Sequence, residues 1–363
     1  MEASSAPRGD GVDDVVFRSA LPLSQQARQF FRLAVTLPAS TDSAETTVLS
    51  APVGVMSGSA PRGESGMAVP LIAEDVFVGT VESNTPTAVS FAHAGDVGAH
   101  LTPGQPYYLE VLTGTLQGER FDVAASPGGG DTVTLRLGAG SLSTRPALAP
   151  DALAGARCAV RRHLTLARLQ SLFRPGLVGR DLFLLADGVW VFENGDLAFY
   201  YLRADGATWS RVGGAGDFRG KVIAPDVSVL MEAKSAKQSW IQAGRVRTNA
   251  FRKNLVPGFQ AFASGFPVDL SPAQARAFVD AATPAATRWN GSNAALLADQ
   301  IELLFRPGRP LDVFYLRGDG VTWRALAGSA NVSADPLLGA TGIVLVLRKN
   351  ADPDYVVPVP FAP

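Results

Sequence analysis

The 363-residue chain has few of the residues that bind transition metals or form disulfide bonds. Cys158 is its single cysteine, and its three histidines, His93, His100 and His163, are scattered. One cysteine excludes an intrachain disulfide and a cysteine-clustered zinc site. We therefore predict no metal centre and no cofactor.

The chain also lacks an excess of charge of either sign and a long apolar run. Its formal net charge is −1, so no overall field attracts nucleic acid or an anionic membrane. No apolar run approaches the ~20 residues of a membrane-spanning helix, and "MEASSAPRGDGVDD" lacks the features of a signal peptide. We expect no nucleic-acid partner and no membrane insertion. Either the protein stays inside the cell or a leader lies upstream.

Glycine and proline, by contrast, are abundant. The chain has 37 glycines and 25 prolines, and 47% of its residues are hydrophobic. This composition is typical of many short elements joined by turns. We predict a mainly β protein built from several small antiparallel barrel or sandwich modules, with a duplicated C-terminal module and a few short helices.

Turn signals and changes of composition divide the chain into four segments. Residues 15–18 and 30–37 are strand-like, and "PASTDSAETT" after them reads as a linker. In "ERFDVAA" and "TVTLRLG", apolar and polar residues alternate as in a strand with one buried face. We predict an N-terminal arm that ends an upstream β module, a barrel or sandwich domain, and two copies of a duplicated module: residues 1–47, 48–160, 161–260 and 261–363.

A repeated phrase predicts the duplication. "YYLRADGATW" begins at Tyr200 and "FYLRGDGVTW" at Phe314. The flanking blocks "DLFLL" and "VSVLMEAKSA" reappear in the same order as "DQIELL" and "GIVLVLRKNA". Three blocks in one order indicate a duplication. We predict four strands in each copy, a short helix in "HLTLARLQSLF", and a helix that starts at Pro272, is capped by Ser271 and turns Phe278 toward the sheet.

The same phrase supplies the candidate ligand-binding residues: Arg203, Trp209, Arg317 and Trp323. An aromatic ring near a cation and near Asp205 or Asp319 is a combination that binds sugars or cationic ligands. The favoured interpretation is structural, however. Asp-Gly between two strands is the local signal for a tight hairpin turn, and the tryptophan then packs on the sheet.

We identify no catalytic residues. No serine stands in a G-x-S-x-G elbow, and alternation in "ARCAVRRH" places Cys158 with Val160 on one face and the arginines on the other. Cys158 is therefore predicted in the core. "RVRTNAFRK" from Arg245 holds four positive charges and could touch phosphate or an acidic surface, but its glycine and proline neighbours favour a solvated loop.

The succession "SAPVGVM", "MAVPLIAEDVFVGTVES", "YYLEVLTGTLQGERFDVAA", "RRHLTLARLQSLF", "FYYLRADGATWSRVG", "FPVDLS" and "DVFYLRGDGVTWRALAG" resembles an uncharacterised family of exported proteins from bacteria of the Verrucomicrobia group. The likeness covers residues 48–363. It departs at His163-Leu164-Thr165, where the family commonly has tryptophan, and in the block before residue 48. The resemblance implies export, an extracellular or cell-surface location and twin β-rich modules. It implies no established activity.

We therefore expect a non-enzymatic structural protein that assembles with itself into a fibre or surface layer. The apolar stretches "QFFRLAVTLP" and "YVVPVPFAP" could add to a neighbour's sheet edge. An alternative is a carbohydrate-binding or adhesion module with polysaccharide as partner, which would need exposed Trp209 and Trp323 rings. A third hypothesis is a hydrolase with its site between domains.

Overall fold

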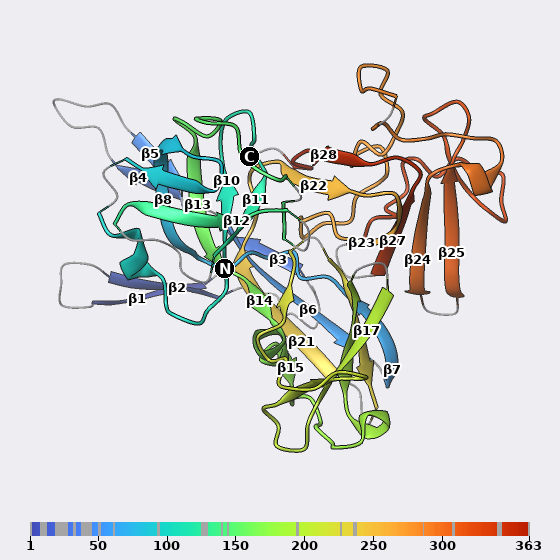
Figure 1. Ribbon diagram of the computed structural model, residues 1–363. Helices are drawn as coiled ribbons and strands as arrows, with labels where there is room; N and C mark the ends of the chain where they lie inside the picture. The colour runs from blue at the N-terminus through green and yellow to red at the C-terminus, as the bar shows by residue number, and fades with distance from the viewer. Residues whose placement is uncertain are drawn as a thin grey trace.

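Figure 1 presents the computed structural model of the chain. It describes residues 2–7, 13–18, 28–31, 34–37, 46–49, 52–60, 62–92, 95–124, 130–138, 141–143, 145–193, 196–225, 227–234, 238–285, 287–306, 309–339 and 343–361. The predicted mainly β class is confirmed, because antiparallel strands dominate and the helices are few and short. Residues 38–45 of the predicted linker and His93 lie outside the described residues.

A closed six-stranded barrel occupies the later part of the predicted second segment and ends two residues beyond it, at Arg162. Leu109 and Val111 point into its core, whereas Tyr108 and Glu110 of the same strand point outward, as alternation requires. The strands close in the order β10-β11-β12-β9-β8-β13. Their bounds, with one short 3-10 helix, are β8 (Asp75–Asn84), β9 (Ala88–Phe91), η1 (Val97–His100), β10 (Tyr107–Val111), β11 (Arg120–Val123), β12 (Thr132–Arg136) and β13 (Arg157–Arg162).

The first copy of the repeat is built from two main sheets. One sheet has the order β18-β17-β16-β20-β7, and the other has the order β15-β21-β6-β3. Val189, Trp209 and Trp240 belong to the core that the two sheets enclose. The elements are β3 (Arg28–Phe31), β6 (Val53–Ala60), β7 (Gly63–Met67), β14 (Leu164–Thr165), α1 (Leu166–Gln170), β15 (Phe173–Arg174), η2 (Phe183–Leu185), β16 (Gly188–Glu193), β17 (Asp196–Leu202), β18 (Trp209–Arg211), β19 (Val222–Ile223), β20 (Val229–Ala233) and β21 (Gln238–Arg245).

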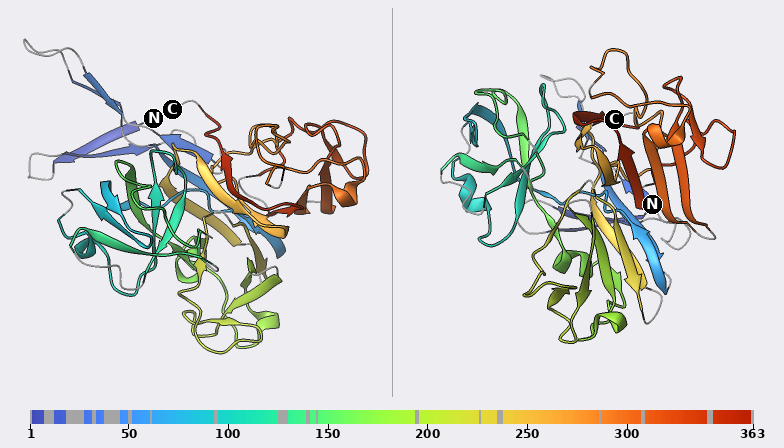
Figure 2. Two further views of the ribbon diagram at one scale, coloured as in Figure 1. Left: turned by 45° about the horizontal axis from the view of Figure 1, so that its top comes forward. Right: turned by 45° about the vertical axis from the view of Figure 1, so that its right-hand side comes forward.

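The second copy repeats this arrangement. Its five-stranded sheet has the order β23-β27-β24-β25-β26, and β22 pairs with β28 in a second layer. Figure 2 shows the barrel and the two copies as three separate lobes. The elements are β22 (Phe251–Leu255), β23 (Gly258–Phe262), η3 (Ala295–Leu297), β24 (Gln300–Arg306), β25 (Arg309–Leu316), β26 (Trp323–Ala325), β27 (Ile343–Arg348) and β28 (Asp352–Val357).

Comparison of the two sheet orders shows that the barrel is inserted into the first copy. Strands β6 and β7 pair with β21 and β20, and β22 and β23 pair with β28 and β27 in the same way. Each copy therefore begins with two successive strands, one in each of its layers. The predicted boundary at residue 160 assigns β6 and β7 to the preceding segment, and the boundary at residue 260 assigns β22 to the first copy and divides β23. In the first copy the barrel lies between β7 and β14. Its first and last strands, β8 and β13, are neighbours, so its two chain connections lie close together, which favours domain insertion.

The two copies share a frame around a buried aspartate. Asp187 accepts hydrogen bonds from the amides of Val178 and Lys234, each at 2.8 Å. Asp299 accepts the equivalent bonds from the amides of Asn290 and Lys349, at 2.8 and 2.6 Å. Both aspartates are fully buried. These bonds satisfy backbone donors that would otherwise be buried without partners.

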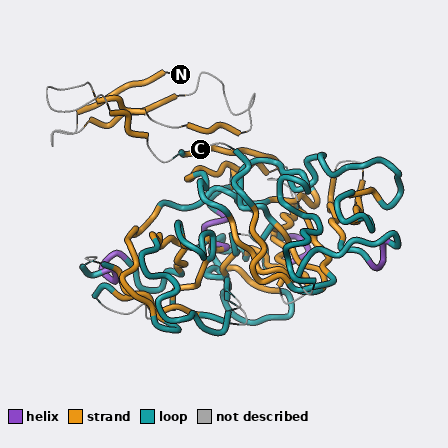
Figure 3. Tube along the Cα trace, turned by 90° about the horizontal axis from the view of Figure 1, so that it is seen from above, coloured by secondary structure: helices purple, strands orange, loops and turns teal. Residues whose placement is uncertain are grey.

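The N-terminal segment forms two hairpins on either side of β3. Strand β1 (Glu2–Pro7) pairs with β2 (Asp13–Arg18), and β4 (Ala34–Leu37) pairs with β5 (Thr46–Leu49). Strand β3 instead joins the first copy by pairing with β6. Figure 3 shows the hairpins lying to one side of the body. The described parts of "QFFRLAVTLP", in β3 and β4, are thus already paired within the chain, and so is the β28 part of "YVVPVPFAP".

The helix in "HLTLARLQSLF" forms as α1, and Thr165 caps it by accepting from the Arg168 amide. The helix predicted from Pro272 does not form. Ser271 does accept the Gln274 amide at 3.1 Å, but only turns follow. Arg276 has a φ of 57°, a left-handed conformation that ends helical winding.

Candidate functional site

The two tryptophans of the repeated phrase lie in the cores of the two copies. Trp209 is 0% exposed and Trp323 is 1% exposed. The Trp209 Nε1 donates to Gln170 Oε1 at 3.1 Å, and the Trp323 Nε1 donates to the Ala277 carbonyl at 2.6 Å. Buried rings present no face for stacking on a sugar. The structure therefore opposes carbohydrate binding at these two residues.

The two arginines of the phrase are at the surface and separate from the tryptophans. Arg203 Nε donates to Asp181 Oδ1 at 2.8 Å, and Arg317 Nε donates to Asn293 Oδ1 at 3.0 Å. Each arginine belongs to a different copy, so the structure does not bring the four candidate residues together. The four residues occupy equivalent positions in two copies of the same hairpin.

The aspartates of the phrase hold the two hairpin turns. The Asp205 carboxylate accepts hydrogen bonds from the backbone amides of Ala207 and Thr208 and from the Thr208 hydroxyl. The hydroxyl, followed by these amides, lowers the pKa of Asp205 to about 2. Asp319 accepts the equivalent amides of the second copy, and its pKa is lowered by the same contacts. Both carboxylates therefore stabilise their hairpin turns through these hydrogen bonds.

A buried charge cluster lies where the barrel meets the modules. Glu110, on the outer face of β10, is 0% exposed and pairs with Arg161 and Arg247. Asn249 Nδ2 also donates to Glu110 Oε1 at 3.1 Å. Asp75 pairs with Arg161, at 2.7 Å, and with Arg245. Burial of these charges requires such pairing.

This cluster corrects the prediction for "RVRTNAFRK". Arg247 is 1% exposed and Lys253 is 4% exposed, so the segment is not a solvated loop. The Arg247 guanidinium lies 4.8 Å from the centre of the Phe251 ring. The segment instead connects the two copies and packs against the barrel. Its three arginines pair with carboxylates of this chain, and Lys253 donates to the Ala261 carbonyl at 3.0 Å.

A second polar link crosses strand β10. His163, 2% exposed, contacts Asp122 through Nε2 and Oδ1 at 2.8 Å. Burial acts to raise the pKa of Asp122, but hydrogen bonds from His163 and Arg136 outweigh it and lower that pKa. The centres of the His163 and Tyr108 rings lie 4.9 Å apart, with the rings tilted by 46°. In the described part of the chain, no hydroxyl or thiol is hydrogen-bonded to His163.

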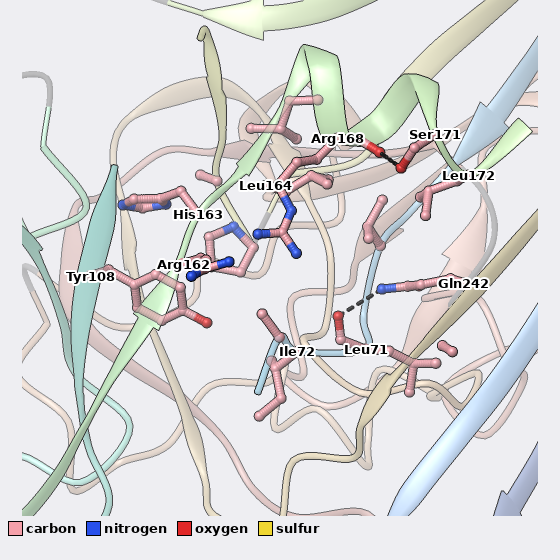
Figure 4. Close-up of a pocket in the computed structure, with 16 residues that line it drawn as sticks. Leu71, Ile72, Tyr108, Arg162, His163, Leu164, Arg168, Ser171, Leu172 and Gln242 are labelled. Atoms are coloured by element: carbon pink, nitrogen blue, oxygen red, sulfur yellow. Dashed lines mark hydrogen bonds between the residues drawn. The ribbon is translucent and has the colours of Figure 1, made fainter. Parts of the chain in front are cut away.

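A pocket lies beside His163, between the barrel and the first copy. Its volume is about 130 Å³. Arg162, Tyr108 and His163 come from the barrel side, whereas Arg168 and Gln242 come from α1 and β21 of the first copy. Figure 4 shows the Arg162 and Arg168 guanidinium groups in the same space, with the Tyr108 hydroxyl beside them. Among the described lining residues, none is acidic.

A different pocket, of about 270 Å³, lies on the outer face of the sheet of the first copy. Trp190 and Phe199 pack there with ring centres 4.7 Å apart, and Tyr201 continues the row at 6.4 Å from Phe199. Trp190 Nε1 donates to Glu232 Oε2 at 2.9 Å, and Glu232 pairs with Lys234. Phe199 itself is buried, so two half-buried rings, Trp190 and Tyr201, are combined with a carboxylate and a cation on this face.

Sequence reasoning missed this aromatic row although a signal was present. In "GVWVFE", Val189 and Val191 are buried toward the core. Alternation places Trp190 on the opposite face. The prediction considered only the tryptophans inside the repeated phrase, and those belong to the inward face.

The remaining candidates are structural. Cys158 is fully buried in the barrel core with Val160, as predicted, and burial raises the pKa of its thiol to about 12. Within the described residues, no group of three or more His, Cys, Asp or Glu side chains is placed to hold a metal ion. Those residues also contain no helix long and apolar enough to cross a membrane.

Comparisons with protein-family models, with curated proteins and with solved structures found no match to this chain.

Proposed function

We propose that this protein is a non-enzymatic structural subunit that acts outside the cell or at its surface and assembles with copies of itself by β-strand addition. The observation that carries the proposal is the pair of N-terminal hairpins. In the described part of the chain, β1–β2 and β4–β5 are two-stranded sheets with no third strand. A two-stranded hairpin alone is marginally stable in water.

A neighbouring molecule could supply the missing strand. The outer edge of each hairpin carries backbone donors and acceptors that a strand from another copy can pair with. Strand β3 supports this mode, because it adds to β6 across a gap in sequence of more than 20 residues. Arg28 of β3 also pairs with Asp269 of the second copy at 3.0 Å. The extracellular or surface location rests on the family resemblance.

Proline substitutions in β4 test the proposal. In a strand, the backbone N–H groups of adjacent residues point to opposite edges, so one of Ala34→Pro and Val35→Pro removes a donor from the outer edge and leaves the hairpin bonds intact. We expect that variant to lose assembly in light scattering without a change in far-ultraviolet circular dichroism. Ala34→Ser and Val35→Thr, which keep the N–H, are the matched controls. Assembly that persists in both proline variants contradicts a role for β4.

The aromatic pocket of the first copy favours a second candidate function, carbohydrate binding. The half-buried Trp190 and Tyr201 rings, which flank the buried Phe199 ring, lie on the face that carries the Glu232–Lys234 pair, and this combination suits stacking and hydrogen bonding to a sugar. The pocket replaces the buried Trp209 and Trp323 as the candidate site.

Affinity electrophoresis through gels that contain neutral or acidic polysaccharide tests this candidate. We expect retardation of the unaltered protein, loss of retardation in Trp190→Ala and partial retention in Trp190→Phe, which keeps an aromatic face. Equal mobility of all three proteins in every polysaccharide gel would rule this function out.

A further inference from the structure

We propose that the pocket between the barrel and the first copy binds a small oxyanion that also carries a hydroxyl group, such as hydrogen phosphate or a uronic acid. Its volume of about 130 Å³ is close to that of an engineered cavity of ~150 Å³ that holds a benzene-sized molecule. A single small anion or one sugar ring therefore matches the available space. This proposal is independent of self-assembly.

Two arginines supply the positive charge. Arg162 ends β13 of the barrel, and Arg168 lies on α1 of the first copy. Their guanidinium groups share the pocket in Figure 4. An anion between them would relieve repulsion between like charges and accept several charge-assisted hydrogen bonds.

Within the described part of the chain, these arginines differ from their neighbours in having no carboxylate partner. Arg161, which is adjacent to Arg162 in the sequence, pairs with Asp75, and so does Arg245. Among the described residues, neither Arg162 nor Arg168 forms an ion pair. Arg162 instead interacts with the Tyr107 hydroxyl.

Two buried polar atoms of pocket-lining residues have no hydrogen-bond partner in the described structure. They are Gln242 Oε1 and His163 Nδ1, in residues that are 4% and 2% exposed. Buried polar atoms without partners are rare and call for a specific explanation. Figure 4 shows the Gln242 amide reaching into the pocket, where its nitrogen donates to the Leu71 carbonyl at 2.6 Å. The Gln242 side-chain oxygen can only accept a hydrogen bond. A ligand that satisfies it must therefore carry a donor, and a hydroxyl group is such a donor.

Such a ligand would join two parts of the fold. Arg162 belongs to the inserted barrel and Arg168 to the copy that contains the insertion. An anion bound by both arginines would stabilise the barrel against that copy, since a ligand that binds only the folded state raises its stability. Binding is therefore measurable both directly and as a rise in the midpoint of thermal unfolding.

Isothermal titration calorimetry of the full chain tests the proposal with three probes: sodium phosphate, sodium glucuronate and neutral glucose. We expect one or both anions to bind and glucose not to bind. Phosphate alone would identify an inorganic or phosphoryl ligand, glucuronate alone an acidic sugar, and either result supports the oxyanion site. Added sodium chloride should weaken binding because it screens the charges.

Substitutions of the two arginines locate the site. Arg162→Gln and Arg168→Gln should each weaken anion binding by about tenfold or more, as expected for loss of a charged hydrogen bond. Both residues are exposed, so the fold should tolerate these changes, which circular dichroism can verify. Arg168→Lys should retain part of the affinity. Arg180→Gln, an exposed arginine outside the pocket, should bind as the unaltered protein does.

Three results would overturn the proposal. The first is absence of heat with both anions up to about 10 mM, a range that would detect millimolar affinity. The second is unchanged binding in the Arg162→Gln and Arg168→Gln double variant, because the anion would then lie elsewhere. The third is equal binding of glucose and glucuronate, because charge would then play no part.

Discussion

The two copies of the repeated module keep the same interior and differ in what surrounds it. Asp187 and Asp299 accept equivalent backbone amides, and Trp209 and Trp323 fill equivalent positions in the two cores. The outer faces have diverged, because Glu302 of β24 occupies the register position of Trp190 in β16. The first copy also contains the inserted barrel.

This difference separates architecture from candidate function. Every feature that the copies share, including the phrase around Trp209 and Trp323, is used to build the module. Both candidate pockets, the one between Arg162 and Arg168 and the one beside Trp190, lie at the first copy. Duplication thus supplied a stable frame, and the candidate sites are found where one copy departs from the other.

The largest expected effect is loss of a core ring in either copy. Trp209→Ala and Trp323→Ala should each lower the free energy of unfolding by about 3–5 kcal/mol, because each leaves a large cavity. Urea denaturation followed by circular dichroism measures the change, with Leu296→Ala, at a position that is 84% exposed, as the surface control. A small loss in one copy only would show that the two interiors are not equivalent.

The next largest effect is expected at a pair of equivalent glycines. A Cβ on Gly179 would lie 1.9 Å from the Arg203 carbonyl oxygen, and one on Gly291 would lie 2.1 Å from that of Arg317. Gly179→Ala and Gly291→Ala should therefore each cost about 3 kcal/mol through backbone displacement. Gly220→Ala, with nothing within 4 Å, is the matched control. Equal stability of all three variants would refute the shared close approach.

A smaller effect should distinguish the copies at the buried aspartates. Arg348, whose side chain is 0% exposed, lies 3.3 Å from Asp299, whereas Gln238 contacts Asp187 at 3.5 Å. Asp299→Asn should therefore cost about 2 kcal/mol more than Asp187→Asn, since it also removes the partner of a buried cation. Chemical denaturation of the two variants measures the difference. An equal cost would mean that Arg348 contributes nothing to the frame.

The smallest effect concerns acid sensitivity of the two turns. Asp205 and Asp319 have lowered pKa values in the folded protein, so their contribution to stability is present above the ordinary value of 3.8. It is lost as the pH falls from there toward about 2. Unfolding measured between about pH 5 and pH 2 should show slightly less acid destabilisation in Asp205→Asn and Asp319→Asn. Identical pH profiles would show that the turn hydrogen bonds do not contribute.

The sequence was sufficient to predict the parts of the fold that depend on local pattern. Alternation placed Cys158 and Val160 in the barrel core, and the repeated phrase located the equivalent hairpins of the two copies. It did not assign β6 and β7 to the first copy, because the whole barrel separates them from β20 and β21. Pairing over such distances leaves no local signal.

The contacts between the barrel and the modules, and the candidate sites, could not be predicted because they also depend on residues that are far apart in the sequence. Arg245 and Asn249 contact Asp75 and Glu110, which precede them by 170 and 139 residues. Without those partners, the charges of this segment resemble those of a solvated loop. Likewise, Arg162 and Arg168 become neighbours of Gln242 only when the barrel packs against the first copy.

Imaging of the native material by negative-stain electron microscopy tests the proposed function most directly. The full chain, purified at high concentration, should form filaments or sheets with a regular repeat in which each subunit shows three lobes. Isolated three-lobed monomers at every concentration, with no higher-order species, would contradict assembly by strand addition.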